Sequence, residues 1–157
     1  MTRRPEPPFL LDVMLGKLAV YLRLCGHDTV YALDRDEERD DELVATADRE
    51  GRTLLTRDVD LSNRPERAFL LTERDPTDQL RELADAGLAL TPTVEPVRCG
   101  RCNGPVGAVA DDESTPEYAP DPNEREQWRC RDCGQVFWKG SHWDRMRGTL
   151  REDRGEE

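Results

Sequence analysis

Four cysteines in two Cys-x-x-Cys pairs are the residues of this chain whose types and spacing point most clearly to chemistry. Cys99 and Cys102 form one pair, and Cys130 and Cys133 form the other. Four thiolates at this spacing suit one tetrahedral zinc ion, and a complete cysteine shell leaves no open position for a reacting water. The alternatives are two disulfides or four free thiols, but no export signal that would favour disulfides is visible. The cysteines therefore predict a structural zinc site.

Aspartates form the second chemical group, because several of them follow apolar segments. Asp12 ends one apolar run, and Asp58 follows another by two residues, while Asp40 and Asp41 open a segment of helical spacing. Ligands of a parallel sheet bind beyond the carboxyl ends of its strands, so these acids are expected to converge there. Converging carboxylates suit Mg²⁺ or Mn²⁺. The alternatives are that Asp58 caps the next turn and that Asp40 and Asp41 belong to a solvated acidic run, whereas a buried Asp12 needs a partner.

Basic and aromatic residues near these two groups are candidates for contact with a ligand that carries phosphates and aromatic bases. Two of the basic residues, Lys17 and Arg57, lie close in sequence to the acids, where they are either phosphate ligands or ordinary solvated side chains. The candidates in the cysteine-rich segment are Arg129, Arg131 and Arg145. Trp138 and Trp143 either stack on bases or pack over the metal site, and packing is the preferred interpretation.

The elements that must position these residues alternate between strands and helices. Apolar runs predict strands at 9–13, 29–32, 52–56 and 68–71, and helical spacing predicts helices at 15–25, 40–50 and 77–86. This alternation predicts an α/β fold with a mostly parallel sheet covered by helices. The expected organisation is a first domain at 8–90, a proline-containing linker, a zinc ribbon at 97–147 and a flexible charged tail at 148–157.

The charge of the chain is strongly negative and unevenly distributed. The net charge is −11, and only two of the 23 basic residues are lysines, which suggests a protein of a high-salt cytoplasm or simply an acidic soluble protein. This excess of acids argues against a non-specific nucleic-acid binder. Segments 97–110 and 127–147 together carry seven basic and two acidic residues, whereas 111–126 carries seven acids and one arginine. The ribbon is therefore basic and is interrupted by an acidic loop.

The apolar runs are too short for a membrane span. None approaches the ~20 residues needed to cross a bilayer, and the N-terminus lacks the long apolar run and cleavage site of a signal peptide. A cytoplasmic protein without membrane contact is expected.

Three sequence blocks carry a resemblance to a known family. FLLDVMLGKLAVYLRLCGHDT, DDELVATADREGRTLLTRDVDL and, beyond the second cysteine pair, VFWKGSHW occur in the family's order. The chain resembles, over about residues 8–147, the PIN-like ribonuclease domain first described at the C-terminus of the mutator-seven exonuclease. The resemblance implies a PIN-like three-layer α/β/α core, an appended C-terminal zinc ribbon and ribonuclease activity that depends on a divalent metal.

The resemblance also assigns roles to individual acids. Asp12 matches the acid of the first strand, Asp58 matches the acid of the Thr-Arg-Asp motif, and Asp40 matches the acid that opens the middle helix. Asp41 is the alternative for the middle position, and Asp60 is a further weak ligand. Unlike broader PIN nucleases, the chain has no clear separate glutamate on a preceding helix.

The sequence therefore predicts a cytoplasmic ribonuclease that uses Mg²⁺ or Mn²⁺ for cleavage, zinc for structure and a basic ribbon to hold RNA. The first alternative is a non-catalytic RNA- or ribosome-binding module on the same scaffold. The second is a protein–protein adaptor that docks through the ribbon.

Overall fold

Four short apolar segments form a parallel sheet in the N-terminal part of the chain. The computed structural model describes residues 4–110, 112–121 and 123–153. The strands are β1 (Phe9–Leu11), β2 (Thr29–Tyr31), β3 (Thr53–Thr56) and β4 (Ala68–Leu70). They pair in parallel in the order β2-β1-β3-β4, so that β1 and β3 lie side by side at the point where the strand order reverses. The mostly parallel sheet predicted from the sequence is confirmed.

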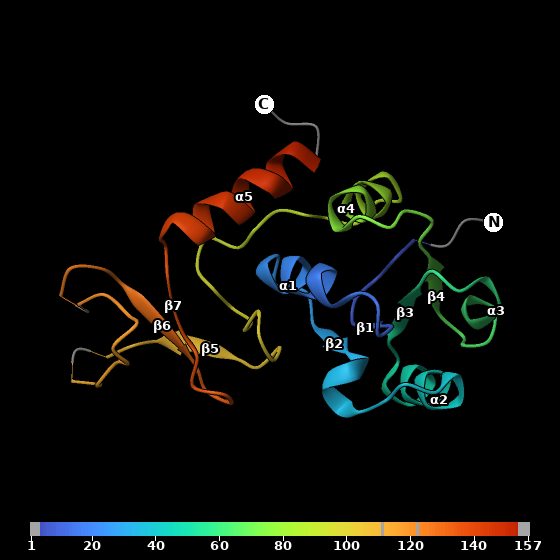
Figure 1. Cartoon of the computed structure of the whole chain (residues 1–157), viewed down its shortest axis with the longest axis horizontal. Coiled ribbons are helices and arrows are strands. Elements are labelled where there is room, and N and C mark those ends of the chain that lie inside the picture. The colour runs from blue at the N-terminus through green and yellow to red at the C-terminus, as the bar shows by residue number, and fades with distance from the viewer. Residues whose placement is uncertain (1–3, 111, 122, 154–157) are drawn as a thin grey trace.

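Helices cover both faces of this sheet and make three layers. The helices are α1 (Gly16–Leu24), α2 (Asp40–Glu50), α3 (Val59–Ser62), α4 (Pro76–Asp85) and α5 (Ser141–Asp153), with a short 3₁₀ helix η1 at Ala32–Arg35. Alternate strand residues face opposite ways, so Leu11 and Leu55 pack with α1, α4 and α5, while Leu10 and Leu54 pack with α2 and α3 (Figure 1). None of these helices, within the described residues, is long and apolar enough to span a bilayer.

Local sequence signals explain where two of the helices begin or end. α2 ends at Gly51, whose φ of 66° places it in the left-handed region that glycine tolerates best. α3, which the apolar spacing did not predict, begins after Asp58, whose side chain accepts a hydrogen bond from the backbone N–H of Leu61. The capping alternative for Asp58 is therefore confirmed.

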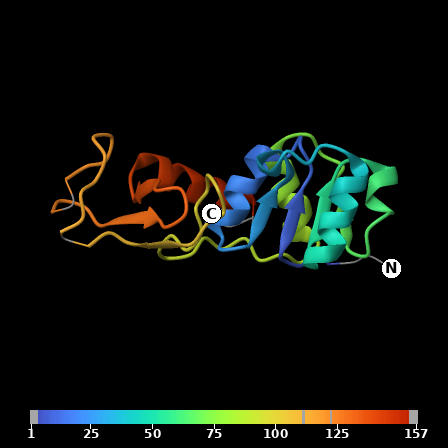
Figure 2. The same ribbon diagram turned by 90° about the horizontal axis from the view of Figure 1, so that it is seen from below.

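The C-terminal part of the chain forms a small antiparallel sheet beside the core. Its strands are β5 (Val106–Ala108), β6 (Gln127–Cys130) and β7 (Val136–Trp138), paired in that order. The core and this ribbon lie at opposite ends of an elongated molecule (Figure 2). Asn103 joins them, because its Oδ1 accepts from the backbone N–H of Thr29 at 2.9 Å and its Nδ2 donates to Asp28 at 2.8 Å. The buried Arg23 adds a bond from Nη1 to the carbonyl of Gly100 at 2.9 Å.

The expected flexible tail from residue 148 is wrong for residues 148–153. These residues continue α5, and Leu150 is fully buried in the same apolar cluster as α1 and α4. Trp143, Met146 and Leu150 recur at helical spacing, so one face of α5 is apolar although the segment is rich in charge. Residues 154–157 lie outside the described part of the chain.

Candidate active site and metal centre

Asp12 and Asp58 lie just beyond the carboxyl ends of two neighbouring parallel strands, β1 and β3. Asp12 is 5% exposed, and its Oδ2 accepts a hydrogen bond of 2.7 Å from the hydroxyl of Thr56. The same hydroxyl accepts from the backbone N–H of Asp58 at 3.0 Å. Thr56 therefore links the carboxylate of Asp12 to the backbone of Asp58. The other oxygen of Asp12 accepts from the backbone N–H of Val13 at 2.8 Å, so both carboxylate oxygens of this buried acid have a donor.

The acids expected from the middle of the chain are arranged differently. Asp40 is the first residue of α2 and is exposed, while Asp41 forms an ion pair with Arg64. The hydrogen bond from Arg64 and its positive charge lower the pKa of Asp41. Asp60 is an exposed residue of α3. Arg64 therefore pairs with Asp41, whereas Asp40 and Glu42 are the other exposed acids in the first turn of α2.

The acids do not form a compact cluster. Within the described residues, the only group of three or more metal-ligating side chains whose ligand atoms all lie within 4.8 Å of one another is the set of four cysteines. The structure thus links the Asp12 carboxylate to the Asp58 backbone through Thr56, but the carboxylates of Asp12, Asp58 and Asp40 do not all lie within 4.8 Å of one another.

Two basic candidates near the acids differ in burial. Lys17 is exposed on α1. The pKa of Asp75 is lowered mainly by hydrogen bonds from Thr77, and the charge of Lys17 adds to this effect. Arg57 is half-buried beside Asp58, and its Nε is a buried donor without a partner among the described atoms. Because buried donors are normally satisfied, the Arg57 guanidinium has capacity for an anionic ligand.

Sequence reasoning missed two neighbours of Asp12. Thr56 carried a signal, because it is a hydroxyl residue at the last position of a strand, two residues before a candidate acid. Tyr31, at the end of β2, carried none; its hydroxyl donates to the carbonyl of Val13. Burial, together with the charges of Asp34 and Asp12, raises the pKa of Tyr31, so its hydroxyl stays a proton donor beside the site at neutral pH.

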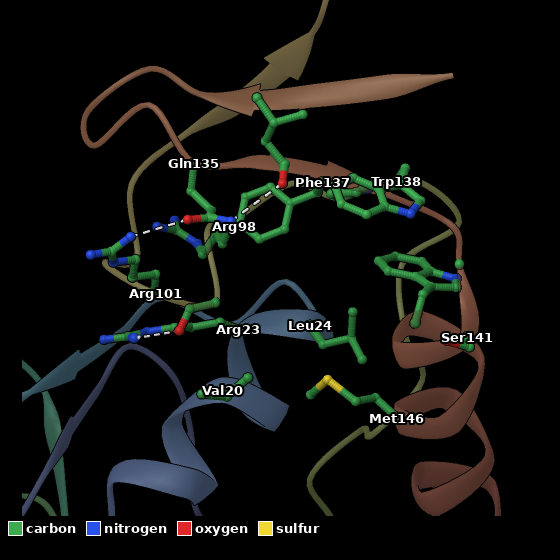
Figure 3. A pocket seen from close by; sticks show the side chains of 15 residues that line it. Val20, Arg23, Leu24, Arg98, Arg101, Gln135, Phe137, Trp138, Ser141 and Met146 are labelled. Carbon is green, nitrogen blue, oxygen red and sulfur yellow. Dashed lines mark hydrogen bonds between the residues drawn. The ribbon is translucent and has the colours of Figure 1, made fainter. Parts of the chain in front are cut away.

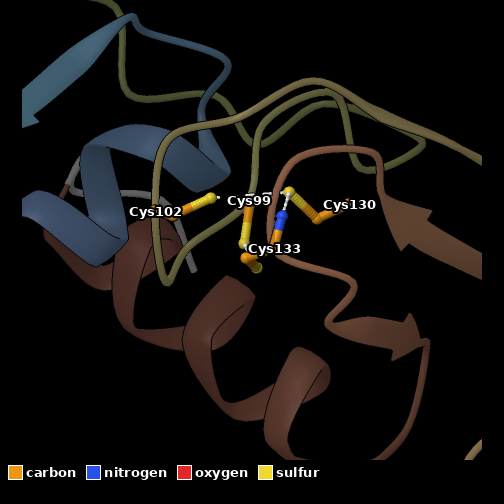
Figure 4. Close-up of side chains that lie close together, drawn as sticks. All are labelled: Cys99, Cys102, Cys130 and Cys133. Carbon is orange, nitrogen blue, oxygen red and sulfur yellow. Dashed lines mark hydrogen bonds between the residues drawn. The ribbon is translucent and has the colours of Figure 1, made fainter.

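The four cysteines meet between two turns of the ribbon, as Figure 4 shows. The sulfurs of Cys99 and Cys133 are 3.7 Å apart, and those of Cys102 and Cys130 are 3.5 Å apart. Thiolates around a tetrahedral zinc with bonds of ~2.3 Å are separated by ~3.8 Å, so the observed spacing fits this ion. The cysteines are free of disulfides. The four sulfurs can therefore hold one metal ion, as expected for a zinc ribbon.

Backbone amides support this centre. The N–H groups of Arg101, Gly104 and Cys133 donate to the sulfurs of Cys99, Cys102 and Cys130, at 3.3, 3.4 and 3.4 Å. Burial opposes ionisation of Cys130, but backbone donors and the neighbouring thiols lower its pKa to about 7. Burial raises the pKa of Cys99 instead. A bound cation offsets this cost, because metal ligation deprotonates thiols.

Two of the ribbon arginines proposed to bind RNA are already paired within the chain. Arg129 and Arg131 both contact the carboxylate of Glu113, at 2.7 and 3.3 Å. A hydrogen bond from the backbone N–H of Ala110, followed by the interactions with Arg131 and Arg129, lowers the pKa of Glu113. Arg145 is exposed on α5. The acidic loop therefore covers part of the positive charge of the ribbon.

Comparison with known families gives a match that includes almost the whole chain. The family model described as "Mut7-C RNAse domain" matches residues 7–150. A search of curated proteins and a search of solved structures each returned no match. The matched span contains the parallel sheet, Asp12, Asp58 and the four cysteines of the ribbon. The chain therefore belongs to the Mut7-C RNAse domain family.

Proposed function

We propose that this chain is a ribonuclease that hydrolyses RNA phosphodiester bonds with Mg²⁺ or Mn²⁺ bound by Asp12, Asp58 and Asp40. The observation that carries the proposal is the hydrogen-bonded connection of Asp12, Thr56 and Asp58 at the carboxyl ends of β1 and β3. These strands are the pair between which the strand order reverses, which is where open parallel sheets bind ligands.

The donor chemistry of these residues fits a hard divalent cation. Each oxygen of Asp12 accepts one hydrogen bond, and an ionised carboxylate has about four acceptor sites, so Asp12 retains lone pairs for a metal. When bound, the cation supplies the charge that activates water and stabilises the leaving oxygen. Asp58, which follows β3, and Asp40, the first residue of α2, are exposed and would supply the further carboxylates. Arg57 neutralises charge on the phosphate.

Replacement of the acids tests this proposal. Asp12→Asn and Asp58→Asn should each abolish metal-dependent cleavage of a labelled RNA, because each change removes one ligand charge, and both variants should keep the far-ultraviolet circular dichroism of the parent. Asp40→Asn should lower the rate more than Asp41→Asn, because Asp41 is held by Arg64. Wild-type cleavage by the first two variants would show that the active site lies elsewhere.

A non-catalytic RNA-binding module is the second candidate. It is favoured by one observation, namely that the only compact group of potential metal ligands in the described residues is the cysteine set. RNA binding without cleavage in Mg²⁺ or Mn²⁺ would select this candidate. Failure to bind RNA at any salt concentration would select a protein–protein adaptor.

A further inference from the structure

A pocket of about 460 Å³ lies at the junction between the core and the ribbon. Figure 3 shows its walls: α1 contributes Val20 and Leu24, β7 contributes Phe137 and Trp138, and α5 contributes Met146. This volume falls within the range of pockets that hold small molecules. The pocket is distinct from the acids at the carboxyl edge of the sheet, because none of those acids lines it.

The charge of this pocket is opposite to that of the chain. Arg23, Arg98 and Arg101 line it, and its lining includes no carboxylate, although the chain carries a net charge of −11. Arg23 is committed to backbone carbonyls of Thr29 and Gly100. Arg98 lies 3.9 Å from the carboxylate of Asp28, which partly offsets its charge. Arg101 therefore supplies most of the positive charge that favours an anionic ligand.

Arg98 has an unused donor. Its Nε is buried and has no hydrogen-bond partner among the described atoms, while its Nη1 donates to the carbonyl of Asn103. Buried donors in native proteins are almost always satisfied, so this Nε is available to an acceptor of a ligand. Arg101 is exposed, and its Nη1 donates to Oε1 of Gln135 at 3.1 Å. A guanidinium fork beside an amide suits a phosphate next to a group with hydrogen-bonding edges.

The aromatic side chains provide flat surfaces next to these cations. Trp138 stacks on Tyr118 with ring centres 6.2 Å apart, and Trp138, Phe137 and Trp143 all line the pocket. Gly140 permits this arrangement, because a Cβ atom at its position would lie 2.9 Å from Nε1 of Trp138. Aromatic surfaces stack on bases of any sequence.

We propose that this pocket binds one nucleotide unit, with the base against Phe137 and Trp138 and the phosphate at Arg98 and Arg101. The aromatic surfaces suit a base, and the guanidinium groups of Arg98 and Arg101 suit a phosphate. This combination fits a nucleotide better than it fits an apolar peptide or a simple anion. An unpaired residue of RNA and a free mononucleotide share this chemistry.

The identity of the bound nucleotide rests on the proposed function. If the chain is a ribonuclease, the nucleotide belongs to an unpaired segment of the RNA substrate. α1 starts beside Asp12, and its last turns line the pocket, so the helix spans ~12 Å from Gly16 to Leu24 between the two sites. An RNA strand anchored in the pocket would thus run along α1 toward the acids. Binding itself does not require cleavage, and the two ideas can therefore fail separately.

Tryptophan fluorescence offers a direct test, because two of the three tryptophans line the pocket. The Asp12→Asn protein, kept without added divalent metal so that the probe stays intact, is titrated with AMP, with inorganic phosphate and with a hexanucleotide of riboadenylate. We expect quenching by the hexanucleotide, or by AMP and the hexanucleotide, and weaker binding as salt increases. In the same background, Arg101→Gln and Trp138→Leu should each weaken binding about tenfold.

The matched control is Arg81→Gln, which removes an exposed arginine on α4 that pairs with Asp78 and does not line the pocket. It should leave the affinity unchanged, and metal content should verify that every variant keeps its ribbon. Quenching by AMP identifies a mononucleotide site, and quenching by the hexanucleotide alone identifies an RNA site. The proposal is overturned if neither binds at millimolar concentration, if phosphate alone binds as well as AMP, or if both pocket variants bind like the control.

Discussion

The carboxylate of Asp12 is held in place before any ligand binds. It is buried at the end of a strand, and its two oxygens accept from a side-chain hydroxyl and a backbone amide. Asp58 is exposed by contrast, and its side chain accepts the capping hydrogen bond from the N–H of Leu61. One acid is therefore fixed and the other is adjustable, an arrangement suited to a site that must admit a bulky polymer.

Thr56 should act as a positioning residue for this pair. Thr56→Val removes the hydroxyl that donates to Asp12, so RNA cleavage should fall by on the order of tenfold or more through misplacement of a carboxylate. Thr56→Ser keeps the hydroxyl and should restore most of the rate. The measurement is cleavage of a labelled RNA as a function of Mg²⁺ concentration, and the valine variant should also require more metal. Equal rates for the valine and serine variants would show that the hydroxyl has no such role.

At the scale of elements, the ribbon is fastened to the edge of the parallel sheet. The first cysteine turn carries both Gly100, which accepts from Arg23, and Asn103, which pairs with the start of β2. A metal ion held by the four cysteines would therefore fix the loop that satisfies the backbone N–H of Thr29. The ribbon thus contributes to the order of an edge strand as well as to a separate surface.

Metal removal should consequently be detected inside the core. The purified protein should contain about one equivalent of zinc, because the four sulfurs have the spacing that this ion requires. After chelation, the amide of Thr29 should lose protection from hydrogen exchange, since its partner Asn103 lies in the cysteine turn. The amide of Thr53, which donates to the carbonyl of Pro8, is the internal control and should keep its protection. Unchanged hydrogen exchange at Thr29 after chelation would show that the metal does not stabilise the edge strand of the sheet.

In the unchanged protein, the charge of Glu113 should weaken RNA binding by the ribbon, because Glu113 pairs with Arg129 and Arg131. Glu113→Gln removes the charge that pairs with Arg129 and Arg131, and both guanidinium groups then become available to phosphates. Affinity for RNA should therefore increase at low salt, and the increase should shrink in molar salt, where the Debye length is ~3 Å. Filter binding over a range of salt concentrations measures this effect. Glu117→Gln, an exposed change in the same loop, should have a smaller effect, and equal effects of the two variants would indicate only a general change of charge.

At the scale of the molecule, α5 holds the two ends together. It starts next to the ribbon strand β7 and packs along α4 and the core, with Leu150 fully buried (Figure 1). The pocket at the junction is bounded by α1, β7 and the first turns of this helix. Any loosening of α5 therefore alters the pocket wall as well as the stability of the core.

Loss of the Leu150 side chain should destabilise the whole chain. Leu150→Ala leaves a cavity in the cluster shared by α1, α4 and α5, and the free energy of unfolding should fall by about 2–5 kcal/mol. Arg145→Ala, an exposed change on the same helix, should alter it by less than ~0.5 kcal/mol. Urea denaturation followed by circular dichroism measures both. A leucine variant as stable as the arginine variant would mean that α5 does not anchor the core.

The sequence alone determined those features that depend on local pattern. Alternating apolar runs predicted the four parallel strands, cysteine spacing predicted the metal centre, and the position of Asp12 at a strand end predicted a partnered buried acid. These features follow from side-chain periodicity and from fixed ligand spacing, which neighbouring residues in the chain specify. The family resemblance agreed with the match over residues 7–150.

Tertiary structure decided everything that depends on segments far apart in the chain. The pairing of Asp41 with Arg64, of Arg129 and Arg131 with Glu113, and of Asn103 with β2 cannot be read from local pattern, because each joins residues 15 or more positions apart. Helix α5 was missed because the charged residues of segment 141–153 outnumber its three buried apolar residues, Trp143, Met146 and Leu150. The junction pocket forms where α1, β7 and α5 pack together, and these elements are far apart in the sequence.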